Sequence, residues 1–149
     1  MGIDKRANNI IRRFNQYDDW EDRYRELIQL GKTAKALDDS NKSDKYLVKG
    51  CQSLVWLKPS FIEGKVYFQA DSDASIVKGI VCLLVEVFSE STPAEIMSNN
   101  VEFLSEIGIT EHLSMNRTNG LSSMVKQIKM YAIAYQSLAE KGIMNAPQN

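Results

Sequence analysis

A chain of 149 residues is long enough for one domain with a substantial buried core. Hydrophobic residues make up 44% and charged residues 25%, as in ordinary globular proteins. The formal net charge of −1 argues against a nucleic-acid-binding protein, which would present a strongly basic face. The two cysteines cannot form a disulfide framework or a four-cysteine metal site, so reduced intracellular thiols are the simpler interpretation.

The chain carries no signal for a membrane. Residues 1–14 are polar and mixed in charge, without the apolar core of a signal peptide. The longest apolar run, residues 80–85, is far too short to cross a bilayer. We therefore expect a cytoplasmic protein without an anchor, a single domain over residues 1–149, and a frayed tail over residues 145–149.

Two helices are predicted before residue 37. Residues 3–14 place Ile10, Ile11 and Phe14 on one side of a short helix. Asp18 or Asp19 can cap the next helix, and its apolar face carries Trp20, Tyr24, Leu27, Ile28 and Gly31. Residues 37–43 are polar and are expected to form a loop.

Strand patterns follow this loop. Residues 53–57 are rich in strand-forming side chains, and Pro59 is expected to interrupt them. Residues 61–68 have the pattern of a hairpin that turns at Glu63-Gly64. The predicted sheet is small, antiparallel and meander-like.

The chain becomes helical from residue 71. Asp71-Ser72-Asp73 is expected to cap a long apolar helix, although two carboxylates could also bind a metal. Gly79 costs that helix about 1 kcal/mol relative to alanine, so it predicts close packing of the helix on the sheet. Thr92-Pro93-Ala94-Glu95 is a capping box.

Two further helices complete the predicted fold. A short one over residues 101–107 stops at Gly108, and a last one ends at Gly142. The apolar face of the last helix carries Leu121, Met124, Val125, Ile128, Ala132, Tyr135 and Leu138. The fold class is α+β, with a small sheet covered by helices on one side.

Cys51 is the candidate reactive residue. It follows Gly50, which allows a turn with positive φ, and it precedes the first strand pattern. The polar residues before it place the thiol near the surface, although a buried, inert cysteine is the ordinary alternative. Cys82 lies inside the apolar run 80–85 and is expected to be structural.

The chemistry open to Cys51 is limited by its neighbours. A cysteine hydrolase needs a base to form the thiolate, and the only histidine is His112 near a helix end. No Cys-x-x-Cys pair supplies a resolving thiol. A thiol of ordinary pKa is adequate for sulfur exchange with a protein partner, which follows the rules of thiol–disulfide exchange.

The motifs together resemble the SufE family of sulfur acceptor proteins. The most specific combination is Gly50-Cys51-Gln52-Ser53, then Asp71-Ser72-Asp73-Ala74, then Val77-Lys78-Gly79. Trp20-Glu21-Asp22-Arg23-Tyr24, Leu30-Gly31, Val55-Trp56, Thr92-Pro93, His112-Leu113 and Arg117 with Gly120 complete the resemblance, which runs almost end to end.

The resemblance implies a fold like that of the cluster scaffold IscU and a role in sulfur transfer. Family members take persulfide sulfur from a pyridoxal-phosphate cysteine desulfurase of the SufS or CsdA type, stimulate that enzyme and pass the sulfur to iron–sulfur cluster assembly. The acceptor cysteine corresponds to Cys51, the carboxylate before the long helix to Asp73, and the helix-start arginine to Arg117.

The expected partners are thus the desulfurase and a downstream iron–sulfur scaffold. We expect no nucleic acid, no membrane and no cofactor or metal on this chain, because pyridoxal phosphate belongs to the desulfurase. The chain itself is expected to be a monomer or a weak dimer. Gly50, Gln52, Asp73 and Arg117 are expected to bind the partner or to gate the Cys51 loop.

Three functions remain open at this stage. The chain could carry sulfur on Cys51, or it could regulate a desulfurase with Cys51 secondary. It could also assemble a cluster itself, which two dissimilar cysteines argue against. Leu54, Ser75 and Met115-Asn116 depart from the family pattern, and none of them is the acceptor cysteine.

Overall fold

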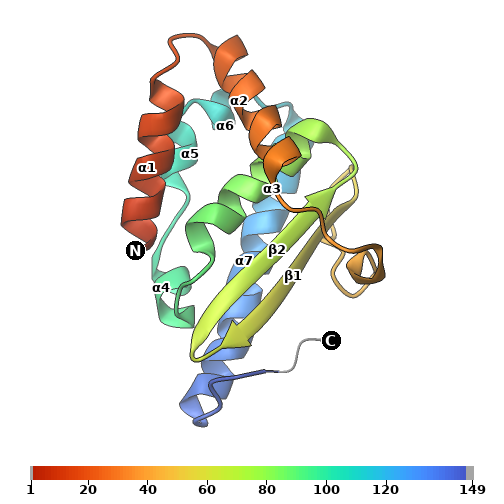
Figure 1. Ribbon diagram of the computed structural model, residues 1–149, viewed down its shortest axis with the longest axis vertical. Helices are drawn as coiled ribbons and strands as arrows, with labels where there is room; N and C mark the ends of the chain where they lie inside the picture. The colour runs from red at the N-terminus through yellow and green to blue at the C-terminus, as the bar shows by residue number, and fades with distance from the viewer. Residues whose placement is uncertain (1, 147–149) are drawn as a thin grey trace.

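A computed structural model describes residues 2–146 of the chain. Helices α1 and α2 come first, then a long connection, a β-hairpin and five more helices (Figure 1). The elements are α1 (Ile3–Asn15), α2 (Trp20–Thr33), the 3₁₀ turn η1 (Asp39–Asn41), β1 (Val55–Ile62), β2 (Lys65–Ser72), α3 (Ser75–Phe88), α4 (Pro93–Ser98), α5 (Glu102–Glu106), α6 (Ile109–His112) and α7 (Met115–Glu140). The α+β class predicted from the sequence is confirmed.

Local capping motifs begin several helices where the sequence predicts them. The Asp19 side chain accepts a hydrogen bond from the Asp22 amide at the start of α2. Thr92 and Glu95 form the reciprocal capping box of α4, with Pro93 as its first residue. Each cap satisfies amide groups that the first turn of a helix leaves without a partner.

The sheet of the described residues is one antiparallel hairpin rather than a longer meander. Glu63 and Gly64 form its turn, both with positive φ, as the sequence predicts. The predicted break at Pro59 is absent, because β1 is an edge strand that does not require an N–H at every position. Pro59 simply pairs with Phe68 within the ladder.

Helices cover one face of the hairpin, as predicted. Val55, Leu57 and Phe61 from β1 face the core together with Val66, Phe68 and Ala70 from β2. The α7 side chains Tyr131 and Tyr135 reach this face, where Tyr135 stacks on Phe61 at 4.7 Å between ring centroids. In Figure 1, α7 runs behind the hairpin and α3 lies along it.

Gly79 serves helix–helix packing, which corrects the predicted helix–sheet contact. An ideal Cβ at Gly79 would lie 2.2 Å from the carbonyl oxygen of Leu27 on α2. A Cβ at Gly31 would likewise lie 3.0 Å from the Gly79 amide nitrogen. The two glycines therefore allow α2 and α3 to cross at backbone contact.

The predicted cap at Asp71-Ser72-Asp73 is wrong. Strand β2 continues to Ser72, and α3 begins after Ala74 without a side-chain cap. The reason is non-local: the segment 35–47 crosses the hairpin (Figure 1) and uses Asp71 as its anchor.

The described part of the tail is held rather than frayed. The Asn145 side chain accepts from the Glu63 amide, and the Ala146 amide donates to the Phe61 carbonyl at 3.0 Å. Residues 147–149 of the predicted frayed tail lie outside the described residues. Within residues 2–146, no helix has both the length and the apolar character needed to span a membrane.

Candidate functional site

Cys51 lies in a short loop, residues 49–54, between the connection and β1. The loop is closed at its base, because the Val48 amide donates to the Val55 carbonyl and the Leu57 amide to the Tyr46 carbonyl, both at 2.8 Å. Residues 49–53 make no backbone–backbone hydrogen bond within the described chain. The loop is thus anchored by backbone hydrogen bonds at its base and not at its tip.

The Cys51 thiol turns inward onto α7. Its Sγ atom donates to the Gly120 carbonyl at 3.5 Å, and the residue is half-buried. It lines a hollow of about 390 Å³, hereafter the Cys51 pocket, together with Gln52, Ser53, Val77, Ile80, Ser114, Asn116, Arg117, Gly120 and Met124. Val77, Ile80 and Met124 form the apolar part of this lining and shelter the sulfur.

Burial raises the pKa of the Cys51 thiol. The charged thiolate is less well solvated here than in water, so the resting thiol stays protonated at neutral pH. His112 does not line the pocket; it stacks on Trp20 at 4.2 Å between ring centroids and its Nδ1 lies 2.8 Å from the Gly108 carbonyl oxygen. The site has no hydrolase-like Cys–His pair in its resting geometry.

Gly50 is required by the path of the loop. Its φ is +93°, a backbone conformation that residues with a side chain rarely adopt. An ideal Cβ at this position would also lie 2.5 Å from Ser123 Oγ on α7. Gly50 therefore sets both the turn and the close seat of the loop on α7.

Asp73 holds the other end of the loop. Its Oδ1 atom accepts from the Leu54 amide at 3.0 Å, and the Leu54 carbonyl accepts from Ser72 Oγ at 2.7 Å. The Asp73 amide also donates to the Leu54 carbonyl at 3.3 Å. These three bonds fix Leu54, at the end of the loop that leads into β1.

Arg117 and Gln52 lie on the same pocket as the thiol. Ser114 caps α7 by accepting from the Arg117 amide, which places Arg117 in the first helical turn. Both Arg117 and Gln52 are exposed and line the Cys51 pocket. The structure therefore gathers Gly50, Cys51, Gln52, Asp73 and Arg117 around one loop.

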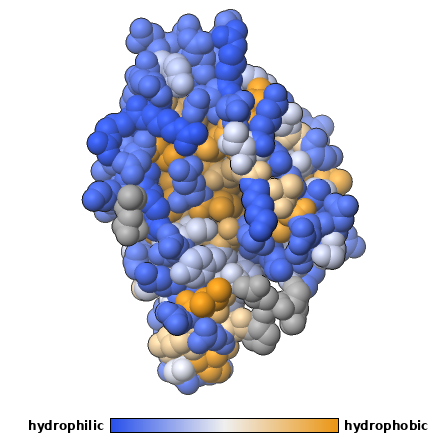
Figure 2. All heavy atoms as spheres, viewed as in Figure 1, coloured by the Kyte–Doolittle hydropathy of each residue, from blue (hydrophilic) through white to orange (hydrophobic). Residues whose placement is uncertain are grey.

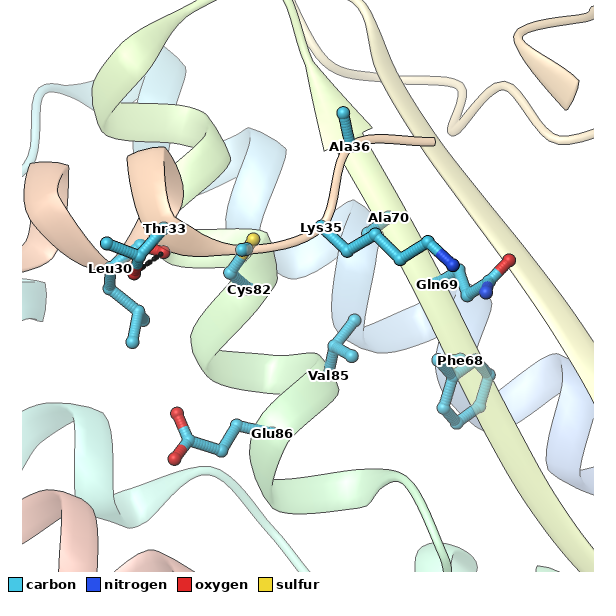
Figure 3. A pocket seen from close by; sticks show the side chains of 11 residues that line it. Leu30, Thr33, Lys35, Ala36, Phe68, Gln69, Ala70, Cys82, Val85 and Glu86 are labelled. Atoms are coloured by element: carbon cyan, nitrogen blue, oxygen red, sulfur yellow. Dashed lines mark hydrogen bonds between the residues drawn. The ribbon is translucent and has the colours of Figure 1, made fainter. Parts of the chain in front are cut away.

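Cys82 lies in a different hollow. It points from the face of α3 opposite Ile80, because two residues span about 200° of a helix. Figure 3 shows its sulfur between the end of α2 and β2, beside Val85, and this pocket has a volume of about 320 Å³. Seen whole, the same face of the molecule gathers apolar side chains over α3 inside a hydrophilic rim (Figure 2).

The two thiols are therefore not equivalent. The Cys82 side chain is 9% exposed, and burial raises its pKa to about 11. No residue lines both cysteine pockets. The cysteines do not converge on one set of ligands.

The sequence did not predict the contacts of α7 and β2 that hold the loop and the crossing segment. Gly120 supplies the carbonyl that accepts from Cys51, Ser123 contacts Gly50, and Asp71 anchors the crossing segment. Only Gly120 carried a local signal of a contact. A glycine inside a helix lowers helix stability, so its presence there indicates that another group packs closely against it. Ser123 and Asp71 carry no such local signature.

Comparison with known proteins identifies the family of this chain. The family model SufE, described as an Fe-S metabolism associated domain, matches residues 8–132. The chain belongs to the SufE family. An uncharacterized SufE-like protein of Rhizobium meliloti (strain 1021) is 37% identical over 130 residues, which cover 84% of this chain and 93% of the relative.

The fold of this SufE family member is also shared with a solved structure. The solution structure of a hypothetical protein from Thermus thermophilus matches with a TM-score of 0.73 at 17% identity. The match covers 89% of this chain and 96% of that one. Family membership ties the chain to iron–sulfur metabolism and supports a role in sulfur transfer.

Proposed function

We propose that this protein is the sulfur acceptor and activator of a pyridoxal-phosphate cysteine desulfurase of the SufS or CsdA type. It takes sulfane sulfur as a persulfide on Cys51 and delivers it to an iron–sulfur scaffold. It is an accessory sulfurtransferase rather than a stand-alone enzyme. The observation that carries the proposal is the half-buried Cys51 thiol on a loop whose tip makes no backbone–backbone hydrogen bonds.

The transfer step needs no oxidant or reductant. The Cys51 thiolate attacks the outer sulfur of the desulfurase persulfide, and a new S–S bond forms to Cys51. The S–S bond within the donor breaks, and the donor cysteine leaves as a thiolate that takes up the proton lost by Cys51. One thiol and one persulfide thus exchange places.

The resting pocket suits a carrier of a reactive sulfur. The hollow beside Cys51 gives space for one added sulfur atom next to Val77, Ile80 and Met124. A sheltered persulfide is less accessible to oxidants and stray thiols than an exposed one. Two free cysteines fit a reducing compartment, and we propose the cytoplasm as the site of action.

Mass spectrometry after incubation with a purified desulfurase and cysteine tests the function. We expect one or more added sulfur atoms on the peptide that contains Cys51, none in Cys51→Ala, and normal loading in Cys82→Ala. Loading of Cys82, or none at all, would contradict the proposal.

The same variants address the alternative of a purely regulatory module. If Cys51→Ala still stimulates release of sulfide by the desulfurase as well as the wild type does, Cys51 is secondary. Loss of sulfur loading and of stimulation together supports the carrier function.

A further inference from the structure

A basic groove runs beside the Cys51 loop. The groove, about 480 Å³ in volume, lies between the segment that precedes the loop and α7, and its lining includes Lys45, Lys49, Lys126 and Met130. Ser123 also lines it, and Ser123 is the residue against which Gly50 packs. The groove and the Cys51 pocket are therefore lined by neighbouring residues of one loop.

The charge of the groove is concentrated and unpaired. Three lysines face it together with one carboxylate, Asp44, although the whole chain has a net charge of −1. Lys45, Lys49 and Lys126 are exposed, and none forms an ion pair within residues 2–146. The Lys45 ammonium lies over the Tyr46 ring instead, 5.3 Å from its centroid.

Exposed apolar side chains lie on the same elements. Met130 in the groove is 52% exposed, Leu54 in the loop 46%, and Met115 at the start of α7 75%. Methionine adapts its shape to a partner surface, and such side chains supply contact area that charge does not. Methionine is enriched at protein–protein interfaces, whose rim is polar, and charged side chains near such a patch steer the approach of a partner of opposite charge.

We propose that the basic groove binds an acidic segment of the protein that donates sulfur to Cys51. This inference rests on the proposed function and adds the chemistry of the partner surface. A carboxylate-rich segment would be attracted by three lysines before contact and oriented by Arg117 across the loop. Lys49 directly precedes the Gly50 turn, so contact with Lys49 would act on the loop that carries Cys51.

Two triple variants with equal charge change test the proposal. In the groove variant, Lys45, Lys49 and Lys126 become glutamate. In the control, Lys32, Lys65 and Lys141 become glutamate; these are exposed lysines outside the groove and outside every ion pair of residues 2–146. The readout is the second-order rate of sulfur loading from a purified cysteine desulfurase, followed by mass spectrometry from low to high salt.

We expect the groove variant to load sulfur about tenfold or more slowly than wild type at low salt, with a flattened salt dependence. The control should slow much less, because it changes net charge without changing the groove. Lys126→Glu gives a second test outside the loop, on an exposed position of α7, and should slow loading in the same direction. Circular dichroism and thermal unfolding confirm that each variant is folded.

The outcomes separate the two proposals. If wild type loads sulfur and both triple variants load equally, the groove is not the docking site, while the carrier function stands. If no desulfurase loads the wild type, the function fails and this inference fails with it. A groove variant that loses binding to a labelled RNA oligonucleotide but loads sulfur normally would identify a nucleic-acid site and overturn the acidic-partner proposal.

Discussion

Burial acts on the two thiols of this chain to different degrees. It raises the pKa of Cys51, and it raises that of Cys82 to about 11. At pH 8 the thiolate fraction of Cys82 is then about one part in a thousand. Exposure separates them in the same direction, because Cys51 is half-buried whereas Cys82 is buried at the wall of its own pocket (Figure 3).

We therefore predict that iodoacetamide labels native Cys51 at least about tenfold faster than Cys82 at pH 8. Peptide mass spectrometry over time gives both rates. Labelling of Cys82 should keep rising as pH approaches 11, because the thiolate is the nucleophile. Unfolding in guanidinium serves as the control and should make the two rates similar, whereas equal rates in the native protein would contradict the assignment.

Asp71 is the buried charge that holds the crossing segment. It is 4% exposed, accepts from the Leu37 and Ser72 amides, and lies 3.4 Å from both Lys42 and Lys78. Burial raises its pKa, but the two amides and the two ammonium groups outweigh burial, so the pKa lies below its usual value. The ionised form is the one that stabilises the fold.

Asp71→Asn should lower the free energy of unfolding by about 2 kcal/mol at pH 7. The native pKa lies below the unfolded value of about 3.9. The stabilisation is therefore fully present above that pH and is lost as pH falls through the native pKa. Urea unfolding at pH 7 and pH 3 should show the difference between variant and wild type shrinking in acid. Asp39 also pairs with Lys42, but its side chain is 98% exposed. Asp39→Asn should therefore leave the free energy of unfolding unchanged within error.

At the scale of elements, two helical glycines differ in the space that a side chain would find. Gly79 is pressed against the backbone of α2, where the nearest atom to an added Cβ is a carbonyl oxygen. Gly120 faces Cys51, and an added Cβ would lie 3.5 Å from Sγ, an ordinary van der Waals contact. Helix propensity favours alanine at both positions by about 1 kcal/mol.

Gly79→Ala should therefore destabilise the protein by about 1–3 kcal/mol, because backbone contact forces α2 and α3 apart. Gly120→Ala is the matched control and should leave stability unchanged or raise it slightly. Urea unfolding of both variants gives the comparison. A Gly79→Ala protein as stable as Gly120→Ala would show that the helices can separate without cost.

At the scale of the whole molecule, short-range signals predicted elements and long-range contacts decided their roles. The caps at Asp19 and Thr92 and the turn at Glu63-Gly64 depend on a few adjacent residues, so the sequence predicts them. The position of Cys51 before the first strand was predictable for the same reason. Asp71 was assigned the wrong role because two of its partners, Leu37 and Lys42, lie about thirty residues earlier in the chain, and the seat of Cys51 on Gly120 joins residues 69 positions apart.

These long-range contacts also predict how the molecule opens. The bond from the Leu54 amide to Asp73 closes one end of the loop, and the bond from Cys51 to Gly120 closes its tip. In the proposed transfer the two sulfur atoms must touch, and we predict that the tip leaves α7 when the donor docks. The bond from Val48 to Val55 at the base can stay closed throughout.

We predict that Asp73→Arg raises hydrogen exchange at the Leu54 amide about five- to tenfold in the free protein, because one hydrogen bond of about 1 kcal/mol is lost. Docking of the desulfurase on the wild type should have a similar effect. The Val48 amide is the internal control and should not change. Asp73→Asn keeps an acceptor oxygen and should behave like wild type. If Leu54 is equally protected in free and bound protein, and Asp73→Arg matches wild type in exchange and in sulfur loading, Cys51 must transfer sulfur from its resting position.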